Sequence, residues 1–280
     1  MHGKVCLITG ANRGIGKATT LALVRMGATV VMVARDPALG AAARDEIIQA
    51  AGNPSVDLLV ADLASLDAVR QLAADFRDRH SQLHVLINNA ALVKHDHTLT
   101  EDGYETTFAV NHLAPFLLTG LLLDTIQAST PARIINVSSM VHIWGRINFE
   151  DLQGERDYNM HTAYNQSKLA NVLIANELAR RLAGTGVTAN SVHPGMVRSD
   201  LVREYTGFIG FMARKGWRPF MKTREKGAAT SVYLASSPEV EGVTGKYFAN
   251  SRVKKSSRSS HDEALARRLW EVSEQLTGLA

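Results

Sequence analysis

Cysteine is almost absent from this sequence, since Cys6 is the single one among 280 residues. One cysteine cannot form an internal disulfide, which excludes a small disulfide-stabilised domain and suits a reducing compartment. Long apolar runs are also missing: the longest, at residues 113–123, is too short to span a bilayer and contains Pro115 and Gly120. The first apolar run begins at Val5, which leaves no room for a signal peptide before it. We therefore expect a cytoplasmic protein with no integral membrane segment.

The sequence has little excess charge and few aromatic residues. Its 31 Lys and Arg against 27 Asp and Glu give a net charge of +4, and aromatic residues make up 6%. Nucleic-acid binding favours a basic stripe with aromatic platforms, and the scattered charges form none. Lys254, Lys255 and Arg258 are interpreted as part of a solvated serine-rich loop. We expect no nucleic-acid partner.

A metal site is not expected either. The histidines at positions 95 and 97 flank Asp96, but a metal would need a third ligand with defined geometry, and the sequence offers none.

Short β-branched runs alternate with helical patterns along the whole chain. Strands are predicted at residues 5–9, 29–34, 56–61, 85–88, 133–138, 188–193 and 245–249, and helices at 15–26, 38–51, 65–80, 103–124, 162–182, 226–236 and 262–276. Strict β–α alternation indicates a parallel sheet with helices on both faces. We expect an α/β protein with a Rossmann-like, doubly wound, three-layer αβα fold, in a single domain over residues 1–280. Ser260 and Glu263 are predicted to form a capping box on the last helix.

A glycine-rich turn joins the first strand to the first helix. It reads Thr9-Gly10-Ala11-Asn12-Arg13-Gly14-Ile15-Gly16. Glycine permits a tight turn and a close approach of the backbone to a pyrophosphate, and the helix N-terminus presents free N–H groups to the anion. In this strand–turn–helix context the turn predicts nucleotide binding, with a purely structural turn as the alternative.

The spacing of this turn, T-G-x-x-x-G-x-G, resembles that of the short-chain dehydrogenase/reductase family. The resemblance implies that Asp62 accepts from the adenine amino group, and that Asn89 and the Pro194-Gly195 turn lie beside the cofactor. Ala91 departs from the N-N-A-G usual in the family after the fourth strand. Helix capping is the alternative role of Asp62 and of Ser199. The cofactor-binding residues that we expect are Gly10, Asn12, Arg13, Gly14, Ile15, Gly16, Arg35, Asp62, Leu63, Asn89, Ala90, Tyr164, Lys168, Pro194, Gly195, Val197 and Ser199.

The end of the second strand predicts the cofactor type. Ala34 stands where members of the family that prefer NAD carry an acidic residue, and Arg35 follows it. A guanidinium beside the ribose favours a 2′-phosphate, and Arg13 would add a second cation. An ion pair with Asp36 is the alternative role of Arg35, although Asp36 before Pro37 also suits a helix N-cap. We expect NADP(H).

The predicted chemistry lies in Tyr164 and Lys168. Hydride transfer to a carbonyl needs a proton donor, and a tyrosine serves if a nearby cation lowers its pKa. Lys168 is four residues further along the same helix face. The family resemblance implies that Ser139 holds the substrate oxygen and that Asn111 orders a water relay behind the lysine. Ser138 is interpreted as structural, and a polar kink in a buried helix is the alternative reading of Asn111.

Longer segments resemble the retinol dehydrogenase-like branch of the family. They include residues 111–119, 167–172 and 197–201, and the gap of 25 residues from Ser139 to Tyr164 also suits this branch. The branch implies an apolar small-molecule carbonyl or alcohol as substrate. Apolar residues at about 196–224 predict a substrate lid, with ordinary helix core as the alternative. The family also implies a possible homodimer through the helices at 113–124 and 162–182.

Two other functions compete with this interpretation. The first is an NADP-binding regulatory or scaffold protein of the same fold without turnover. Retention of Ser139, Tyr164 and Lys168 argues against it. The second is a sugar-nucleotide epimerase, whose branch uses a different glycine spacing and a longer C-terminal domain.

Overall fold

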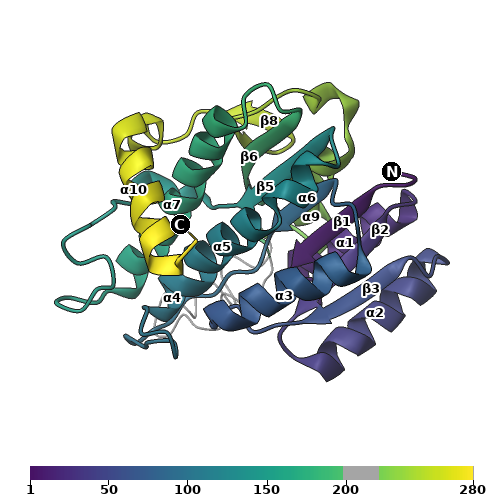
Figure 1. Cartoon of the computed structure of the whole chain (residues 1–280), viewed down its shortest axis with the longest axis horizontal. Helices are drawn as coiled ribbons and strands as arrows, with labels where there is room; N and C mark the ends of the chain where they lie inside the picture. The colour runs from purple at the N-terminus through teal and green to yellow at the C-terminus, as the bar shows by residue number, and fades with distance from the viewer. Residues whose placement is uncertain (198–220, 280) are drawn as a thin grey trace.

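The computed structural model describes residues 1–197 and 221–279 and contains one eight-stranded sheet, in the order β3-β2-β1-β4-β5-β6-β7-β8 (Figure 1). The strands are β1 Val5–Thr9, β2 Thr29–Ala34, β3 Val56–Val60, β4 Val85–Asn88, β5 Ala132–Val137, β6 Val187–His193, β7 Tyr247–Ala249 and β8 Arg252–Lys254. Neighbours from β3 to β7 run parallel, whereas β7 and β8 are antiparallel.

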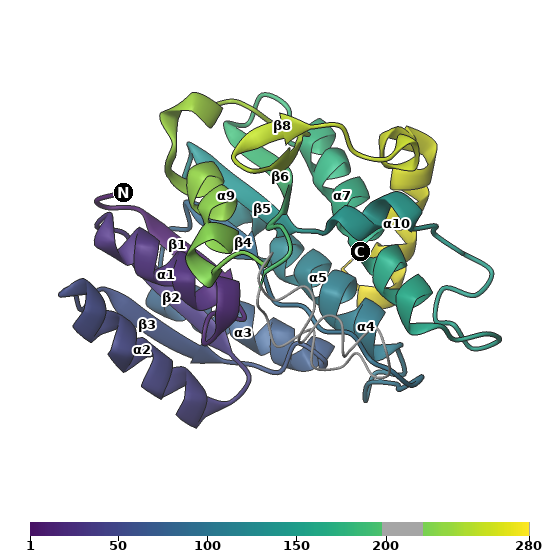
Figure 2. The same ribbon diagram turned by 180° about the vertical axis from the view of Figure 1, so that it is seen from behind.

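Helices cover both faces of this sheet. They are α1 Gly14–Arg25, α2 Pro37–Ala51, α3 Leu66–Arg79, α4 Thr106–Phe108, α5 Ala114–Leu121, α6 Leu123–Gln127, α7 Met160–Arg181, α9 Arg224–Ser236 and α10 Glu263–Thr277, with a π-helix η1 Ala109–Leu113 and the 3-10 helices η2 Met140–Trp144, η6 Pro238–Val240 and η7 Arg258–His261. The first face carries α3, α5, α7 and α10, and the opposite face carries α1, α2 and α9 (Figures 1 and 2). The predicted doubly wound, three-layer αβα fold is confirmed.

Each strand of the sheet centre contributes to two apolar cores. In β1, Leu7 joins the core under α3, α5 and α7, whereas Cys6 and Ile8 join the core under α1 and α2. Because both faces of a parallel sheet are buried, its strands are continuous apolar runs rather than alternating ones. The strand order reverses direction at β1 and β4, so the carboxyl ends of these strands form the crevice where doubly wound sheets bind ligands.

The predicted helix over residues 103–124 is wrong as one continuous element. The chain instead forms α4, the π-helix η1, α5 and α6 in succession. Glu105 begins this series, because its buried carboxylate accepts from the N–H groups of Thr107 and Phe108, each at 2.7 Å. A π-turn inserts one residue into a helix and is frequent at functional sites. The polar kink proposed for Asn111 is therefore present, in the form of this π-helix.

Two predictions near the C-terminus also fail. Residues 245–249 do not end the sheet, because β8 follows and pairs Val253 with Phe248, so Lys254 lies in a strand and not in a loop.

The predicted capping box is wrong as well. Asp262 is the N-cap of α10 and accepts from Leu265 N–H at 2.9 Å, whereas the hydroxyl of Ser260 donates to Ser257 O. Asp262 directly precedes the first helical residue, so its carboxylate reaches the free N–H groups of the first turn, whereas Ser260 lies two residues further away.

The C-terminal helix α10 crosses the face formed by α5 and α7 (Figure 1). Leu269 and Trp270 are buried there, and the Trp270 ring meets Phe116 of α5 edge to face at 4.9 Å. The homodimer expected through the helices at 113–124 and 162–182 stays a prediction. In the structure, α10 covers part of the face that these helices would use (Figure 1). Within the described residues, no helix has the length and apolarity needed to cross a membrane.

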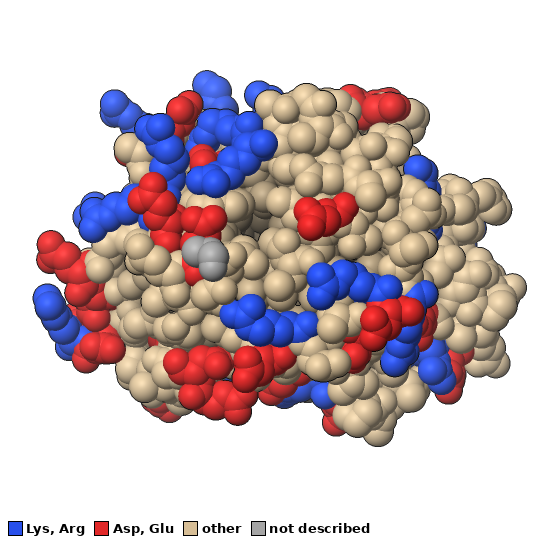
Figure 3. Space-filling model, in the orientation of Figure 1, with Lys and Arg blue, Asp and Glu red and all other residues tan. Residues whose placement is uncertain are grey.

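Charged side chains on this face do not form a single-sign stripe. Basic residues gather at the end where α7 and α10 meet, and acidic and basic residues adjoin each other over α3 (Figure 3).

Candidate active site

The glycine-rich turn forms a cradle in which backbone conformation or close packing favours glycine at positions 10, 14 and 16. Gly10 and Gly14 have φ values of 63° and 58°, which favour glycine. A Cβ on Gly16 would lie 2.3 Å from Gly10 O and 2.7 Å from the Asn89 amide nitrogen. The cradle opens at the N-terminus of α1, where free N–H groups attract an anion. The site therefore fits the pyrophosphate of a dinucleotide.

Asn89 shapes this cradle from the end of β4. Its side-chain Nδ2 donates to Thr9 O at 2.7 Å and to Gly10 O at 3.3 Å. The Thr9 hydroxyl in turn accepts from the N–H groups of Asn89 and Ala90 at 2.9 and 3.0 Å. The predicted cofactor residues Asn89 and Ala90 thus hold the turn against the end of β1.

The positions expected to select the cofactor lie at the end of β2. Arg35 is exposed immediately after the buried Ala34. Asp36 caps α2 by accepting from Leu39 N–H at 2.9 Å, and none of the ion pairs between described residues joins it to Arg35. The N-cap expected of Asp36 is confirmed, and its carboxylate does not neutralise Arg35. Arg13, the second predicted cation, is exposed at the N-cap position of α1.

Asp62 and Leu63 follow β3 at the same edge of the sheet. Asp62 is exposed and accepts from Ala64 N–H at 3.0 Å, whereas Leu63 is buried. The cap of α3 is Ser65, which accepts from Ala68 N–H at 3.3 Å. The alternative role of Asp62 as a helix cap is therefore wrong, and its side chain braces the turn before the cap.

The Pro194-Gly195 turn closes β6 as predicted. Gly195 has a φ of 90°, and a Cβ there would lie 3.0 Å from the side chain of Lys222. Val197 pairs with Lys222 in an isolated parallel bridge, and Lys222 N–H donates to Met196 O at 2.8 Å. Ser199 and most of the expected lid at 196–224 lie outside the described residues.

Tyr164 and Lys168 lie on the first turns of α7. Asn159 begins this helix by accepting from the N–H groups of His161 and Thr162 at 2.9 and 3.2 Å. Tyr164 is 8% exposed and Lys168 1%, and the Lys168 ammonium lies 5.5 Å from the centre of the Tyr164 ring. The ammonium donates to Val137 O at 3.2 Å. The expected pairing of the two side chains on one helix face is present.

Burial changes the protonation of this lysine. Desolvation lowers the pKa of Lys168 from 10.5 to about 7, because a charged amine is disfavoured away from water. The amine therefore titrates close to neutral pH, next to a phenol that it can stabilise as phenolate while it is charged.

The two serines after β5 have different surroundings. The Ser138 hydroxyl is buried and donates to Lys168 O at 2.7 Å, so it ties the strand to α7. Ser139 is half-buried and starts η2, where its hydroxyl accepts from Val141 N–H at a long 3.4 Å. The structural role expected of Ser138 is observed, and the Ser139 hydroxyl is the more accessible of the two.

Asn111 is fully buried in the π-helix η1. Its side chain accepts from Leu92 N–H at 2.8 Å, and its Nδ2 lies 2.8 Å from Leu92 O and 3.1 Å from the Ser167 hydroxyl. It therefore connects the loop after β4 to the residue that precedes Lys168. The water relay expected of Asn111 stays a prediction.

Sequence reasoning missed two histidines beside Ser139. His142 donates through Nδ1 to Ser139 O at 2.7 Å and accepts at Nε2 from Ser257 N–H at 3.1 Å, while burial lowers its pKa. His193 accepts at Nδ1 from Met140 N–H at 3.2 Å, and burial, followed by the charge of Lys222, lowers its pKa to about 4. Both rings support the turn after Ser139. Ser257 and Met140 are far from these histidines along the chain, so no spacing in the sequence could have indicated those two contacts.

Asn171 was also missed. Its Nδ2 donates to Val137 O at 3.3 Å, so one carbonyl receives both Asn171 and the Lys168 ammonium. The spacing of three residues from Lys168 along a helix was the signal that could have placed both on one face.

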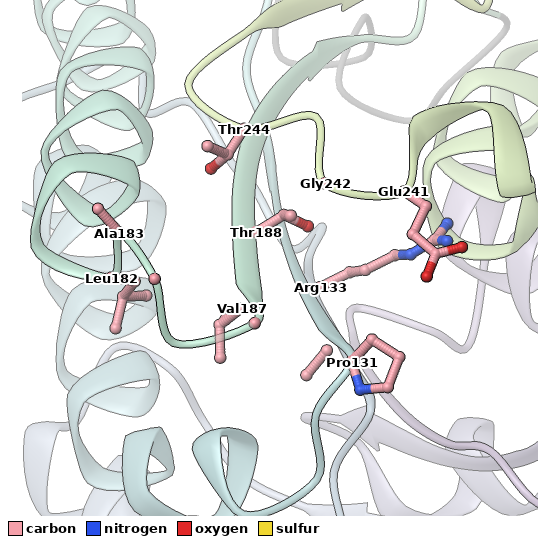
Figure 4. Close-up of a pocket in the computed structure, with 12 residues that line it drawn as sticks. Pro131, Arg133, Leu182, Ala183, Val187, Thr188, Glu241, Gly242 and Thr244 are labelled. Carbon is pink, nitrogen blue, oxygen red and sulfur yellow. The ribbon is translucent and has the colours of Figure 1, made fainter.

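A cavity of about 310 Å³ lies at the opposite end of the sheet (Figure 4). It is lined by the starts of β5 and β6, including Pro131 and Val187, and by Glu241. The Arg133 guanidinium beside it donates to Leu234 O and Ser237 O at 2.8 and 3.0 Å. This cavity is therefore separate from the edge that carries Tyr164. Among the described residues, no group of three or more His, Cys, Asp or Glu side chains is arranged for a metal ion.

Comparison with known proteins agrees with this geometry. The family model of short chain dehydrogenases matches residues 4–208. Retinol dehydrogenase 14 of Mus musculus is 47% identical over 294 aligned residues, which cover 100% of this chain and 87% of that protein. Retinol dehydrogenase 11 of Homo sapiens is 45% identical over 281 residues, with 100% and 87% covered.

Solved structures give the same result. An uncharacterized protein from Mycobacterium paratuberculosis matches with a TM-score of 0.81 and 35% identity, covering 99% of this chain and 94% of that one. The active-site complex of Pseudomonas aeruginosa RhlG with NADP matches with a TM-score of 0.72 and 26% identity, covering 89% and 94%. Fold and sequence agree over nearly the whole length, so the chain belongs to the short-chain dehydrogenase/reductase family of oxidoreductases, in its retinol dehydrogenase-like branch.

Proposed function

We propose that this chain is an NADP(H)-dependent oxidoreductase that interconverts an apolar carbonyl compound and its alcohol, with Tyr164 as general acid and base. The observation that carries the proposal is the buried Tyr164–Lys168 pair, with the ammonium 5.5 Å from the ring centre. Both side chains belong to α7, to which the hydroxyl of Ser138 is bonded. The next residue, Ser139, carries the more accessible hydroxyl.

The residues of the chain divide the proton chemistry among them. Tyr164 donates its phenolic proton to the developing alkoxide in reduction and removes the alcohol proton in oxidation. The charged form of Lys168 favours the phenolate, and Val137 O fixes the position of the ammonium. The Ser139 hydroxyl orients the substrate oxygen toward Tyr164. The nicotinamide, when bound, supplies or accepts the hydride.

The preference for NADP(H) rests on Arg35. The guanidinium is exposed at the end of β2, and Asp36 is turned away as the cap of α2. A free cation at this position suits the 2′-phosphate. The solved RhlG complex, a relative at 26% identity, contains NADP according to its description.

The apolar substrate is supported by the side chains around Ser139. Met140, Ile143 and Trp144 of η2 are 46%, 47% and 63% exposed, and Met196 after β6 is 50% exposed. Large apolar side chains that are exposed near a polar site suit the binding of an apolar ligand. The relatives named as retinol dehydrogenases are consistent with such a substrate.

A regulatory or scaffold protein without turnover is disfavoured. The relatives in Mus musculus and Homo sapiens are named as dehydrogenases, and the buried ammonium of Lys168, beside Tyr164, donates to Val137 O.

The experiment that tests the proposal is Tyr164→Phe, with Tyr233→Phe as the control. Tyr233 lies on α9, and its hydroxyl donates to Glu239 at 2.9 Å on the surface. NADPH binding is measured by titration of cofactor fluorescence, and turnover by NADPH oxidation with a panel of apolar aldehydes. Tyr164→Phe should lower turnover by at least about 100-fold and leave NADPH binding intact. Equal turnover in the two variants would refute the role of Tyr164.

A further inference from the structure

The peptide bond between Ser139 and Met140 is held by a histidine ring on each side. Its carbonyl, Ser139 O, accepts from Nδ1 of His142 at 2.7 Å and from the His142 backbone N–H at 3.2 Å. Its N–H group, on Met140, donates to Nδ1 of His193 at 3.2 Å. Both polar atoms of one peptide plane are therefore bonded to rings from different elements, since His142 lies in η2 and His193 ends β6. These two rings are called the histidine clamp below.

The partners of each ring fix its tautomer. Ser139 O can only accept, so Nδ1 of His142 carries the proton, and Nε2 of the same ring accepts from Ser257 N–H at 3.1 Å. Met140 N–H can only donate, so Nδ1 of His193 is unprotonated and the ring proton lies on Nε2. Burial lowers the pKa of both rings, that of His193 to about 4, so both are uncharged at neutral pH. The clamp therefore consists of two neutral histidines in opposite tautomers.

His142 is fixed by structure from the C-terminal part of the chain. The side chain is 1% exposed, and its ring centre lies 4.6 Å from that of Tyr247 in β7. Its second partner, Ser257, is the N-cap of η7, where the Ser260 hydroxyl donates to Ser257 O at 2.6 Å. Both Tyr247 and Ser257 lie beyond the residues to which the family model matches. This part of the chain thus reaches the serine turn through one ring.

His193 connects the same peptide to the cofactor edge. It ends β6 and immediately precedes the Pro194-Gly195 turn, which is expected beside the nicotinamide. Its bond to Met140 N–H crosses from β6 to the chain that follows β5, the neighbouring strand of the sheet. The turn that carries Ser139 and the turn expected at the cofactor are therefore held at one relative position.

The clamp acts where the chain leaves Ser139. On the other side of this residue, Ser138 N–H donates to Val192 O at 2.8 Å, and the Ser138 hydroxyl donates to Lys168 O at 2.7 Å. A rotation of the peptide after Ser139 would change ψ of Ser139 and φ of Met140, and with them the direction of the serine relative to η2. Each ring opposes this rotation, because its hydrogen bond to the peptide would be lost.

We propose that His142 and His193 are positioning residues that clamp the peptide between Ser139 and Met140 and thereby position the Ser139 hydroxyl for the substrate oxygen. The inference rests on the proposed function for its effect on turnover. Its geometric part, the clamp with its two tautomers, stands on the hydrogen bonds alone.

Leucine and asparagine substitutions separate the hydrogen bond from the ring. His142→Leu and His193→Leu each remove the side-chain bond to the peptide. In His142→Asn the amide nitrogen can replace Nδ1 as donor, and in His193→Asn the amide oxygen can replace Nδ1 as acceptor. The control is His84→Leu. His84 is also buried and accepts at Nδ1 from Val5 N–H at 3.1 Å, but it precedes β4 at the opposite edge of the sheet.

The first readout is turnover with NADPH and an apolar aldehyde. Each leucine variant of the clamp should lower kcat by about tenfold with little change in the KM for NADPH, because a small displacement of a catalytic group reduces rate more than binding. Each asparagine variant should recover most of this loss, and His84→Leu should keep the wild-type kcat. Clamp variants no slower than His84→Leu, or asparagine variants as slow as the leucine variants, would overturn the proposal.

The double variant that combines His142→Leu with His193→Leu tests whether both rings act on one peptide. Loss of either bond frees the same peptide, so the double variant should be about as slow as the slower single variant. A loss of kcat equal to the product of the two single losses would show that the rings act independently, which contradicts the clamp.

The second readout does not depend on turnover. Histidine labelled with ¹⁵N reports the tautomer of each ring by NMR, with the two signals assigned from His142→Asn and His193→Asn. At neutral pH the proton should lie on Nδ1 of His142 and on Nε2 of His193. Any other pair of tautomers overturns the clamp. A wild-type protein that reduces no carbonyl would instead refute the proposed function, and the tautomers would still decide whether the clamp exists.

Discussion

Lys168 is the residue with the largest conflict between charge and environment in the described site. It is 1% exposed, and among the described residues its ammonium has one hydrogen-bond acceptor, Val137 O. A lysine in this position costs stability while it is charged, because its lost hydration is only partly replaced. In return, the charge of Lys168 can lower the pKa of the Tyr164 phenol.

Substitution of Lys168 by Met should change how stability depends on pH. The folded-state pKa of Lys168 is lowered from 10.5 to about 7, so between these values the unfolded chain binds more protons than the folded one. The free energy of unfolding of the wild type should therefore rise with pH in this window, by up to about 1.4 kcal/mol per unit. Below pH 7 both states are protonated, and this contribution no longer changes.

Urea unfolding at pH 7, 8 and 9 measures this effect. Lys168→Met should lose the rise that the wild type shows, and Lys226→Met, a change to an exposed lysine of α9, controls for the loss of one positive charge. Parallel curves for the wild type and Lys168→Met would show that Lys168 does not titrate in this range.

Arg35 should decide the choice between the two nicotinamide cofactors. Arg35→Ala removes the cation expected at the 2′-phosphate, so the dissociation constant for NADPH should rise by about tenfold or more while that for NADH changes little. Arg44→Ala is the control, because Arg44 is a neighbouring arginine of α2 that is paired with Asp45. Isothermal titration with both cofactors gives the ratio. An unchanged ratio in Arg35→Ala would place the phosphate elsewhere.

At the scale of single residues, sequence reasoning worked where roles follow from local spacing. Tyr164 and Lys168 share a helix face because they are four residues apart, and Asp36 caps α2 because it precedes Pro37. His142 and His193 were missed because their partners, Ser257 and Met140, are distant in the chain. Long-range hydrogen bonds of this kind leave no periodic pattern in the sequence.

Among the elements, α10 shows how local rules compete. Both Ser260 and Asp262 suit an N-cap, and the structure uses Asp262. Asp262→Ala should therefore lower the free energy of unfolding by about 1 kcal/mol, because the N–H of Leu265 loses its acceptor. Glu263, the partner in the predicted capping box, is exposed at the first position of the helix. Glu263→Ala should cost no more than a few tenths of a kcal/mol, about the size of a favourable charge at a helix start.

Thermal and chemical unfolding of these two variants distinguishes the alternatives. A larger loss in Glu263→Ala than in Asp262→Ala would restore the predicted capping box and contradict the observed cap.

The π-helix η1 is the element that the sequence indicated least. Apolar residues run without interruption through 113–118, and this pattern is equally compatible with a continuous helix. The contacts that accompany the π-helix are made with residues distant in the chain. Asn111 bonds to Leu92 and Ser167, and His112 bonds to Ser273. Adjacent residues that each need a distant partner are the physical reason for the distorted helix.

For the whole molecule, alternation of strands and helices was sufficient to predict the sheet and its layers. The central parallel strands β2, β1, β4 and β5 contribute buried apolar residues to the cores on both faces and therefore have strong apolar patterns. The final strand β8 was missed, because all three of its residues are exposed and two of them are basic. Charged side chains are common on edge strands, where they discourage further pairing. The cytoplasmic location and the homodimer stay predictions.

The central claim is that Tyr164 completes a hydride transfer between NADP(H) and an apolar carbonyl group. The most direct measurement uses NADPH deuterated at C4 of the nicotinamide, with retinal or another apolar aldehyde, and mass spectrometry of the alcohol formed. The wild type should transfer one deuterium to the product, from one face of the ring only, and Tyr164→Phe should form almost no labelled alcohol. Label that stays in the cofactor with Tyr164 intact, or labelled alcohol formed equally well by Tyr164→Phe, would contradict the claim.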